Sequence, residues 1–284
     1  MTEKPSAAVG EIRRGDSLLL VVIAALFIVL YAPVVGPLVK QWLNDPNYQH
    51  GLAVPVVSAF MLWRRRAALR AAGGAHAPVA GVLVIACASI LLIGGAAASE
   101  LFTARLSLPM MLIGLILFFE GMKFVREAAF PLLFLFMMIP LPYIVYYKIT
   151  FPMQLMSARL GATLIGAIGI NVVRHGNILS LPNYTLEVVA ACSGLRSLMT
   201  MATLALVLCA FSRLSVARKA VLAASSIPIA IAANTIRLAV SAVGACAVSP
   251  SFADGALHEI SGLIVFFTGF LMLLLVWGLL RWKQ

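Results

Sequence analysis

Apolar stretches close to the length of a membrane span recur along the whole chain. A helix needs about 20 apolar residues to cross the roughly 30 Å hydrocarbon core of a bilayer. Hydrophobic residues make up 62% of the 284 residues, and a soluble domain of this size would expose too much apolar surface. The sequence therefore predicts an all-α, polytopic membrane helical bundle. Because no internal repeat is apparent, residues 1–284 are expected to form a single transmembrane domain.

Eight apolar stretches are predicted to cross the membrane. They lie at 17–38, 49–63, 78–98, 103–119, 125–145, 192–211, 219–243 and 257–280. The first stretch is expected to be retained as a span, because no small-residue cleavage site clearly follows it.

The short loops between these stretches are basic, and they set the expected orientation. Eight spans place fourteen of the 21 Lys and Arg residues on one side, together with both termini. These residues are Lys4, Arg13, Arg14, Arg64, Arg65, Arg66, Arg70, Lys123, Arg126, Arg213, Arg218, Lys219, Arg281 and Lys283. The positive-inside rule makes that side the cytoplasm. The same pattern explains the net charge of +11, so no nucleic-acid partner is expected. The lipid bilayer is the expected environment of the chain.

The segment 146–175 mixes polar and apolar residues, which favours an amphipathic helix. A full crossing here would move the basic loop at 213–219 to the outside. We therefore expect an interfacial or re-entrant helix on the outer side. The stretch 177–189 then alternates apolar and polar residues around Pro182-Asn183, which predicts a short hairpin.

Three chemically active side chains share the outer side in this arrangement. Cys192 begins one span, Arg237 lies near the outer end of the next, and His258 begins the last. A thiol, a guanidinium and an imidazole can serve as nucleophile, oxyanion stabiliser and proton shuttle in acyl transfer. The helix N-terminus at Cys192, with Arg196 four residues on, favours the thiolate.

Each of these residues also has a structural interpretation. A cysteine at a helix start can be purely structural, and a histidine there can be an ordinary interfacial residue. Arg237 can reach the interface as a snorkelling side chain. An intramembrane arginine is nevertheless costly and usually marks function or a buried pair. Asn234 and Ser241 share the helical face of Arg237, which indicates a polar stripe.

Other polar residues are secondary candidates. His50 precedes the second span on the outer side and can line the same cavity, and Glu187 can approach His258 through the hairpin. The other three cysteines, Cys87, Cys209 and Cys246, show no metal-binding spacing. Neither a metal nor any other cofactor is expected, and no disulfide framework is indicated.

An ordered set of short motifs resembles a known family. They are Asn47-Tyr-Gln-His-Gly-Leu-Ala-Val-Pro55 with Leu62-Trp-Arg-Arg-Arg66, Ala190-Ala-Cys-Ser-Gly-Leu-Arg-Ser197, Asn234-Thr-Ile-Arg237 and His258-Glu-Ile-Ser-Gly262. Each motif alone is weak, but their order and spacing over roughly 45–265 are specific. The chain resembles the exosortases, bacterial integral-membrane cysteine proteases and transpeptidases related to the archaeosortases.

The resemblance implies that Cys192 is the nucleophile and that Arg237 and His258 are its catalytic partners. It implies substrates that are exported proteins with a C-terminal sorting signal, made of a Pro-Glu-Pro-type motif, one transmembrane helix and a basic tail. Arg174, Arg196 and Arg237 can then receive the acidic residue of that motif. The expected location is a bacterial inner membrane, with the active site facing the periplasm.

The expected function is cleavage of this sorting signal through a thioester acyl-enzyme, which links the protein to protein sorting and exopolysaccharide-associated surface export. Water or an amine resolves the thioester. One alternative is a transporter or flippase of polysaccharide-related lipids that uses Arg237 as an anion site, which gives Cys192 no role. Another is a scaffold subunit of an export complex, in which none of the three residues matters alone.

Overall fold

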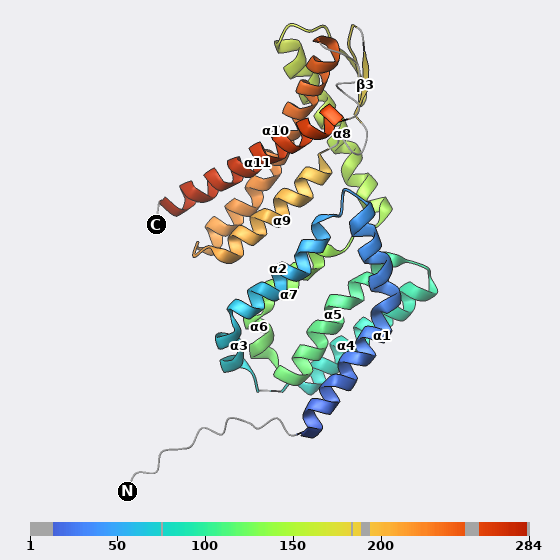
Figure 1. Ribbon diagram of the computed structural model, residues 1–284, viewed down its shortest axis with the longest axis vertical. Coiled ribbons are helices and arrows are strands. Elements are labelled where there is room, and N and C mark those ends of the chain that lie inside the picture. The colour runs from blue at the N-terminus through green and yellow to red at the C-terminus, as the bar shows by residue number, and fades with distance from the viewer. Residues whose placement is uncertain (1–13, 75, 183, 189–193, 248–255, 283–284) are drawn as a thin grey trace.

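The computed structural model describes residues 14–74, 76–182, 184–188, 194–247 and 256–282. It is a helical bundle with one small sheet, so the predicted all-α polytopic fold class is confirmed (Figure 1). The first half comprises α1 (Arg14–Asn44), α2 (His50–Arg64), α3 (Arg66–Ala72), α4 (Pro78–Ala97), α5 (Leu101–Glu120), α6 (Met122–Glu127), α7 (Ala129–Phe134) and the 3-10 helix η1 (Leu135–Met138). The second half comprises α8 (Tyr143–Ala167), β1 (Val173–His175), β2 (Ile178–Ser180), β3 (Thr185–Glu187), α9 (Leu195–Phe211), α10 (Val216–Ala247) and α11 (Ala256–Trp282).

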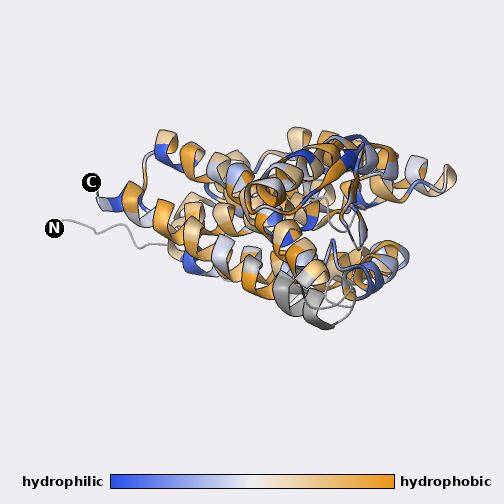
Figure 2. Cartoon of the chain, turned by 90° about the horizontal axis from the view of Figure 1, so that it is seen from above, coloured by the Kyte–Doolittle hydropathy of each residue, from blue (hydrophilic) through white to orange (hydrophobic). Residues whose placement is uncertain are grey.

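Among the described residues, five helices are long and apolar enough to cross a membrane. They are Leu18–Asn44, Pro78–Ala97, Leu101–Glu120, Val216–Cys246 and Gly262–Trp282. Large apolar side chains such as Val29 and Ile90 are exposed on their outer faces, as expected for contact with lipid. Figure 2, coloured by hydropathy, shows apolar residues along much of the length of the helices. The protein is therefore a multi-pass membrane protein.

The remaining three predicted spans differ from these five. α2 and α9 are shorter helices of 15 and 17 residues. The prediction of one continuous helix over 125–145 is wrong, because this stretch is divided into α6, α7, η1 and an extended segment. Pro140 and Pro142 lie in that segment; proline lacks an N–H donor and disfavours helical backbone in the residue before it. Ile139 is accordingly extended, with φ −89° and ψ 120°.

α8 follows this break and is bent by 83° from the helical residues Ala129–Met138. The helix expected over 146–175 is present but runs from Tyr143 to Ala167, so the last part of the predicted segment, which includes β1, is not helical. If the bent pair forms one span, the candidate spans number six in the described part of the chain, fewer than the eight predicted.

The small sheet has the antiparallel order β1-β2-β3. The predicted hairpin corresponds to β2 and β3, and its turn is closed by the Leu181 N–H, which donates to the Tyr184 carbonyl at 2.8 Å. Asn183 in this turn and residue 189 lie outside the described residues. β1 was not predicted. Leu179 and Leu186 face each other in β2 and β3 and pack with α8 and α10.

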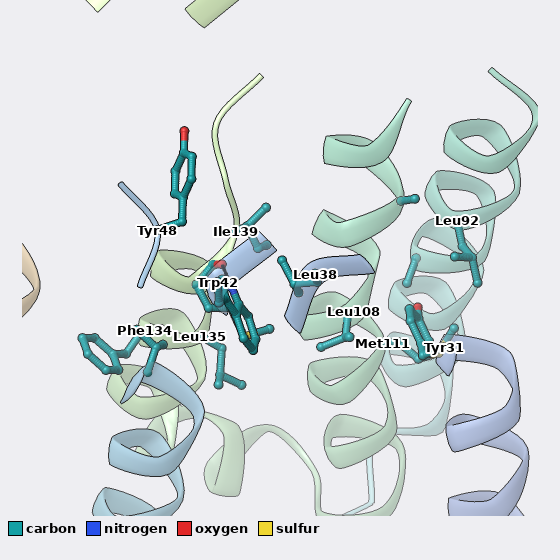
Figure 3. Close-up of a cluster of buried hydrophobic side chains, with 14 residues drawn as sticks. Tyr31, Leu38, Trp42, Tyr48, Leu92, Leu108, Met111, Phe134, Leu135 and Ile139 are labelled. Atoms are coloured by element: carbon teal, nitrogen blue, oxygen red, sulfur yellow. Dashed lines mark hydrogen bonds between the residues drawn. The ribbon is translucent and has the colours of Figure 1, made fainter. Parts of the chain in front are cut away.

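The core of the first half joins α1, α2, α4, α5 and η1 (Figure 3). Within it, the Trp42 indole donates to the Met138 carbonyl at 2.9 Å, and the Tyr31 hydroxyl lies 3.0 Å from that of Ser107. Gly51 leaves room for the indole, since a Cβ there would lie 2.3 Å from the Trp42 Nε1. These contacts hold the start of α2, where His50 lies, against the end of η1.

Several helix ends that carry basic residues meet at one end of the bundle, which we call the basic end. Arg65 forms an ion pair with Glu127 at 3.3 Å. The Arg64 guanidinium lies over the Phe211 ring, and Arg218 donates to the Leu280 carbonyl at 3.2 Å. The ends of α2, α6, α9, α10 and α11 are thus joined, as the sequence-based orientation requires.

Reporter fusions that distinguish the two sides of the membrane test this orientation. Fusions after Trp63 and Lys219 should report the cytoplasm, because both positions belong to the basic end. A fusion after Asn183 should report the outside. A cytoplasmic signal at Asn183 would contradict the proposed placement of the sheet and of everything that follows it.

Candidate active site

α8 and α10 are joined by contacts spaced one helical turn apart. The Asn234 amide on α10 donates to the Ser157 hydroxyl on α8 at 3.1 Å, and each residue is only 2% exposed. One turn further, a Cβ on Gly161 would lie 2.5 Å from the Leu238 side chain. Residues four apart share a helical face, so these two pairs hold the helices at close range. The contact fixes the position of the Asn234 amide.

The N-terminus of α9 lies against the same amide. Gly194 caps α9 with φ 86° and ψ 0°, in the left-handed region that glycine adopts without strain. A Cβ at Gly194 would lie 3.0 Å from the Asn234 Cγ. Both the backbone conformation and the space therefore require glycine. Cys192 precedes Gly194 by two residues and lies outside the described residues.

Arg237 reaches from α10 to α11. It lies three residues after Asn234, and its guanidinium packs on Gly262, where a Cβ would lie 3.3 Å from Cζ and Nη2. His258 precedes Gly262 by four residues in α11, so about one helical turn separates their backbones. The side chain of His258 is outside the described residues. Ser241, four residues after Arg237, is buried and continues the polar stripe.

These contacts bring together three of the motifs that the sequence singled out. Gly194 belongs to the motif of Cys192, Asn234 and Arg237 form their own motif, and Gly262 belongs to the motif of His258. Asn234 lies roughly 27 Å along α10 from Val216 at about 1.5 Å per residue. That distance is close to the thickness of the hydrocarbon core. The meeting point is therefore separated from the start of α10 by a distance comparable to the thickness of a bilayer core.

Arg196 and two ring contacts connect the N-terminus of α9 to His50. Arg196, in the first turn of α9, interacts electrostatically with Tyr146 of α8. The Tyr146 ring lies 6.5 Å from that of Tyr48, which lies 6.4 Å from the His50 ring. The structure thus places His50 two ring contacts away from Tyr146, beside the loop between α1 and α2.

The Tyr48 and Tyr146 rings line a pocket of about 490 Å³ that sequence reasoning missed. Its lining includes Gln41, Asp45, Asn47, Tyr48, Glu100, Phe102, Arg105, Tyr143 and Tyr146. Arg105 is only 4% exposed and donates to Gln41 at 2.7 Å. The sequence signal that could have revealed this pocket is Arg105 itself, an arginine at the start of an apolar stretch. An arginine near the end of an apolar stretch is also what marked Arg237.

The pocket contains charged and neutral groups side by side. Burial raises the pKa of Tyr48 to about 12, with nearby Tyr146 and Asp45 adding to the shift, so the site disfavours the phenolate form. Hydrogen bonding to Thr103 lowers the pKa of Glu100, whose carboxylate caps α5 by accepting from the Phe102 and Thr103 N–H groups. A buried guanidinium, carboxylates and phenols therefore line one cavity.

The remaining candidates lie elsewhere. Arg174 on β1 and Glu187 on β3 are exposed, and Arg174 donates to the Gly176 carbonyl at 2.9 Å, within its own turn. Cys87 is exposed on α4, Cys209 is buried in α9, and Cys246 is half-buried in α10. Within the described ranges, no group of three His, Cys, Asp or Glu side chains is placed to hold a metal ion.

The family model of the transmembrane exosortases matches residues 42–275. The chain belongs to the transmembrane exosortase family. The match contains every motif described above and confirms the resemblance drawn from them. Neither a search of curated proteins nor one of solved structures found a match. The exosortase family has a general role as membrane proteases and transpeptidases, and this exosortase shares it.

The contact between Gly194 and Asn234 can be tested by substitution. Gly194→Ala should destabilise the protein by roughly 1–3 kcal/mol, because a Cβ strains left-handed backbone and meets Asn234. Gly166→Ala in α8 is the matched control, since nothing lies within 4 Å of a Cβ there. Thermal unfolding in detergent measures both variants. Equal midpoints for the two would show that α9 does not begin in this way.

Proposed function

We propose that this exosortase is a cysteine endopeptidase and transpeptidase of the bacterial inner membrane. It cleaves the C-terminal sorting signal of exported proteins, with both termini in the cytoplasm and the active site facing the periplasm. The observation that carries this proposal is the meeting of three motifs, through the contacts of Gly194 with Asn234 and of Arg237 with Gly262. These motifs contain Cys192, Arg237 and His258.

In the proposed reaction, the Cys192 thiolate attacks the carbonyl carbon of the scissile peptide bond. Arg237 donates hydrogen bonds to the resulting oxyanion, and His258 passes a proton to the departing amine. A thioester between Cys192 and the exported protein remains. Water or an amine then attacks this thioester and releases the thiol. The N-terminus of α9 and Arg196 favour the thiolate form of Cys192.

The surroundings of the site fit a substrate that is anchored in the bilayer. Its transmembrane helix lies beside the bundle, and the segment with the Pro-Glu-Pro-type motif extends over the outer end. Arg196 receives the acidic side chain of the motif, while the pocket lined by Tyr48 and Tyr146 holds the neighbouring residues, with His50 beside Tyr48. Asn234 positions the start of α9, and the exposed Arg174 and Glu187 contact the outermost part of the substrate. The product enters exopolysaccharide-associated surface export.

Co-expression with a tagged candidate substrate tests the nucleophile. Cys192→Ala should abolish processing while the protein remains inserted, because no other group then forms the thioester. Cys87→Ala, Cys209→Ala and Cys246→Ala are the matched controls and should retain activity. Mass spectrometry of the substrate's new C-terminus is the measurement. Processing that survives in Cys192→Ala would exclude covalent thiol catalysis and favour the transporter or scaffold alternatives.

A second experiment separates the roles of Arg237 and His258. Loss of one oxyanion donor typically lowers the rate by about 10²–10³, so Arg237→Ala should impair both peptide and activated ester substrates. Arg237→Lys should also lose most activity, because lysine lacks the planar fork. Loss of a proton donor lowers the rate by about 10²–10⁴, and His258→Ala should do so for the peptide alone.

The contrast between substrates decides the assignment. An activated ester has a leaving group that needs no proton, so His258→Ala should still form the acyl-enzyme from it. Single-turnover acylation of purified enzyme measures this step for each variant. Identical responses of the two alanine variants to both substrates would contradict the division of roles, even if both residues were essential.

A further inference from the structure

A second cavity, of about 270 Å³, lies at the basic end between the two halves of the bundle. We call it the basic cleft, and its lining residues are Met61, Arg64, Arg65, Phe130, Pro131, Ala210, Phe211 and Lys219. α2 and α7 form one wall, and α9 and α10 form the other. Three cationic side chains from both walls thus face one space.

Two of these cations are not neutralised by a carboxylate. Arg65 forms an ion pair with Glu127 and also donates to its carbonyl. Arg64 instead lies over the Phe211 ring, with its Cζ 5.6 Å from the ring centre. In the described part of the chain, no carboxylate lies within 4.0 Å of Arg64 or Lys219. The basic cleft therefore carries a net positive charge that favours an anion.

An apolar track leads from the basic cleft toward the middle of the bundle. Val56 and Phe60 lie four residues apart on α2 and are 69% and 47% exposed. The Phe60 ring lies 5.8 Å from that of Phe211 and 5.9 Å from that of Trp63. A cationic opening next to exposed aromatic and aliphatic side chains suits a ligand with an anionic head and an apolar tail.

We propose that the basic cleft binds the phosphate of an anionic phospholipid, whose acyl chains lie along Val56 and Phe60. Basic pockets between membrane helices on the cytoplasmic side are typical sites for such headgroups. Arg64 and Lys219 donate hydrogen bonds to the phosphate oxygens from opposite walls. The cleft has a volume of about 270 Å³, whereas one water molecule occupies about 30 Å³ of the liquid. It therefore has room for a phosphate and its glycerol. The lipid joins α2 to α9 and α10, and its binding stabilises the folded state.

Lipid binding to the purified full-length exosortase tests the proposal. Phosphatidylglycerol should appear as a retained adduct in native mass spectrometry and raise the unfolding midpoint. Phosphatidylethanolamine with the same acyl chains should do so much less, because its ammonium group opposes the cationic cleft. Inorganic phosphate at the same concentration should give no comparable shift. Equal effects of the two lipids would overturn the proposal, and equal protection by phosphate would assign the cleft to a free anion.

Charge-removing variants locate the site. Each Lys or Arg near an anionic lipid contributes about 1 kcal/mol, or roughly fivefold in affinity, so Arg64→Gln with Lys219→Gln should weaken phosphatidylglycerol binding about 25-fold. The control variant removes the charges of Lys123 and Arg126 by substitution with Gln. Both residues are exposed on α6 at the basic end but outside the cleft, so the affinity should change less than twofold.

Arg64→Lys keeps the charge and should bind within a few fold of the unaltered protein. This variant provides the comparison if the double glutamine variant fails to fold. Equal losses in the cleft variant and in the α6 control would show nonspecific attraction and contradict a site. Neither experiment requires peptidase activity, so the lipid site and the proposed function can fail separately.

Discussion

One buried amide, that of Asn234, holds together segments that are far apart in the sequence. It donates a hydrogen bond to Ser157 of α8. The same side chain packs against Gly194, the residue that caps the N-terminus of α9. A buried polar group is destabilising unless it is hydrogen-bonded, so this amide can occupy few other positions. Its place on α10 also determines where Arg237 meets Gly262. The relative position of α8, α9, α10 and α11 at the candidate site thus follows from contacts made at one face of one helix.

Arginine and lysine side chains at the two ends of the bundle differ in their surroundings. At the basic end the cations are largely exposed, and several belong to short loops. At the other end Arg105 is almost fully buried, Arg237 is half-buried, and both contact residues of other helices. Exposed cations retain their hydration, whereas buried ones need partners supplied by the fold. This difference separates the exposed cations, which set the orientation of the protein, from the buried ones, which can take part in the proposed peptide chemistry.

The spans were predictable where hydropathy alone decides the structure, as in α1, α4, α5, α10 and α11. The stretch at 125–145 was not, because most of it is as apolar as a continuous span while Pro140 and Pro142 remove backbone donors. β1 was missed because three exposed residues carry no alternating pattern. The meeting of the site motifs followed from topology and the family resemblance. The Arg105 pocket did not, since it needs Gln41, Glu100 and Tyr146 from elements that only tertiary packing brings together.

α10 is longer than a bilayer is thick. Its 32 residues extend roughly 48 Å, against a hydrocarbon core of about 30 Å. The residues of α10 that follow Asn234 pack against α8 and the sheet, and in the proposed function this packing holds the candidate site at a set height relative to the membrane. A substrate helix is also held at a set height by its own apolar length. In the proposed reaction, the scissile bond is then selected by its distance from the membrane surface as well as by the sequence around it.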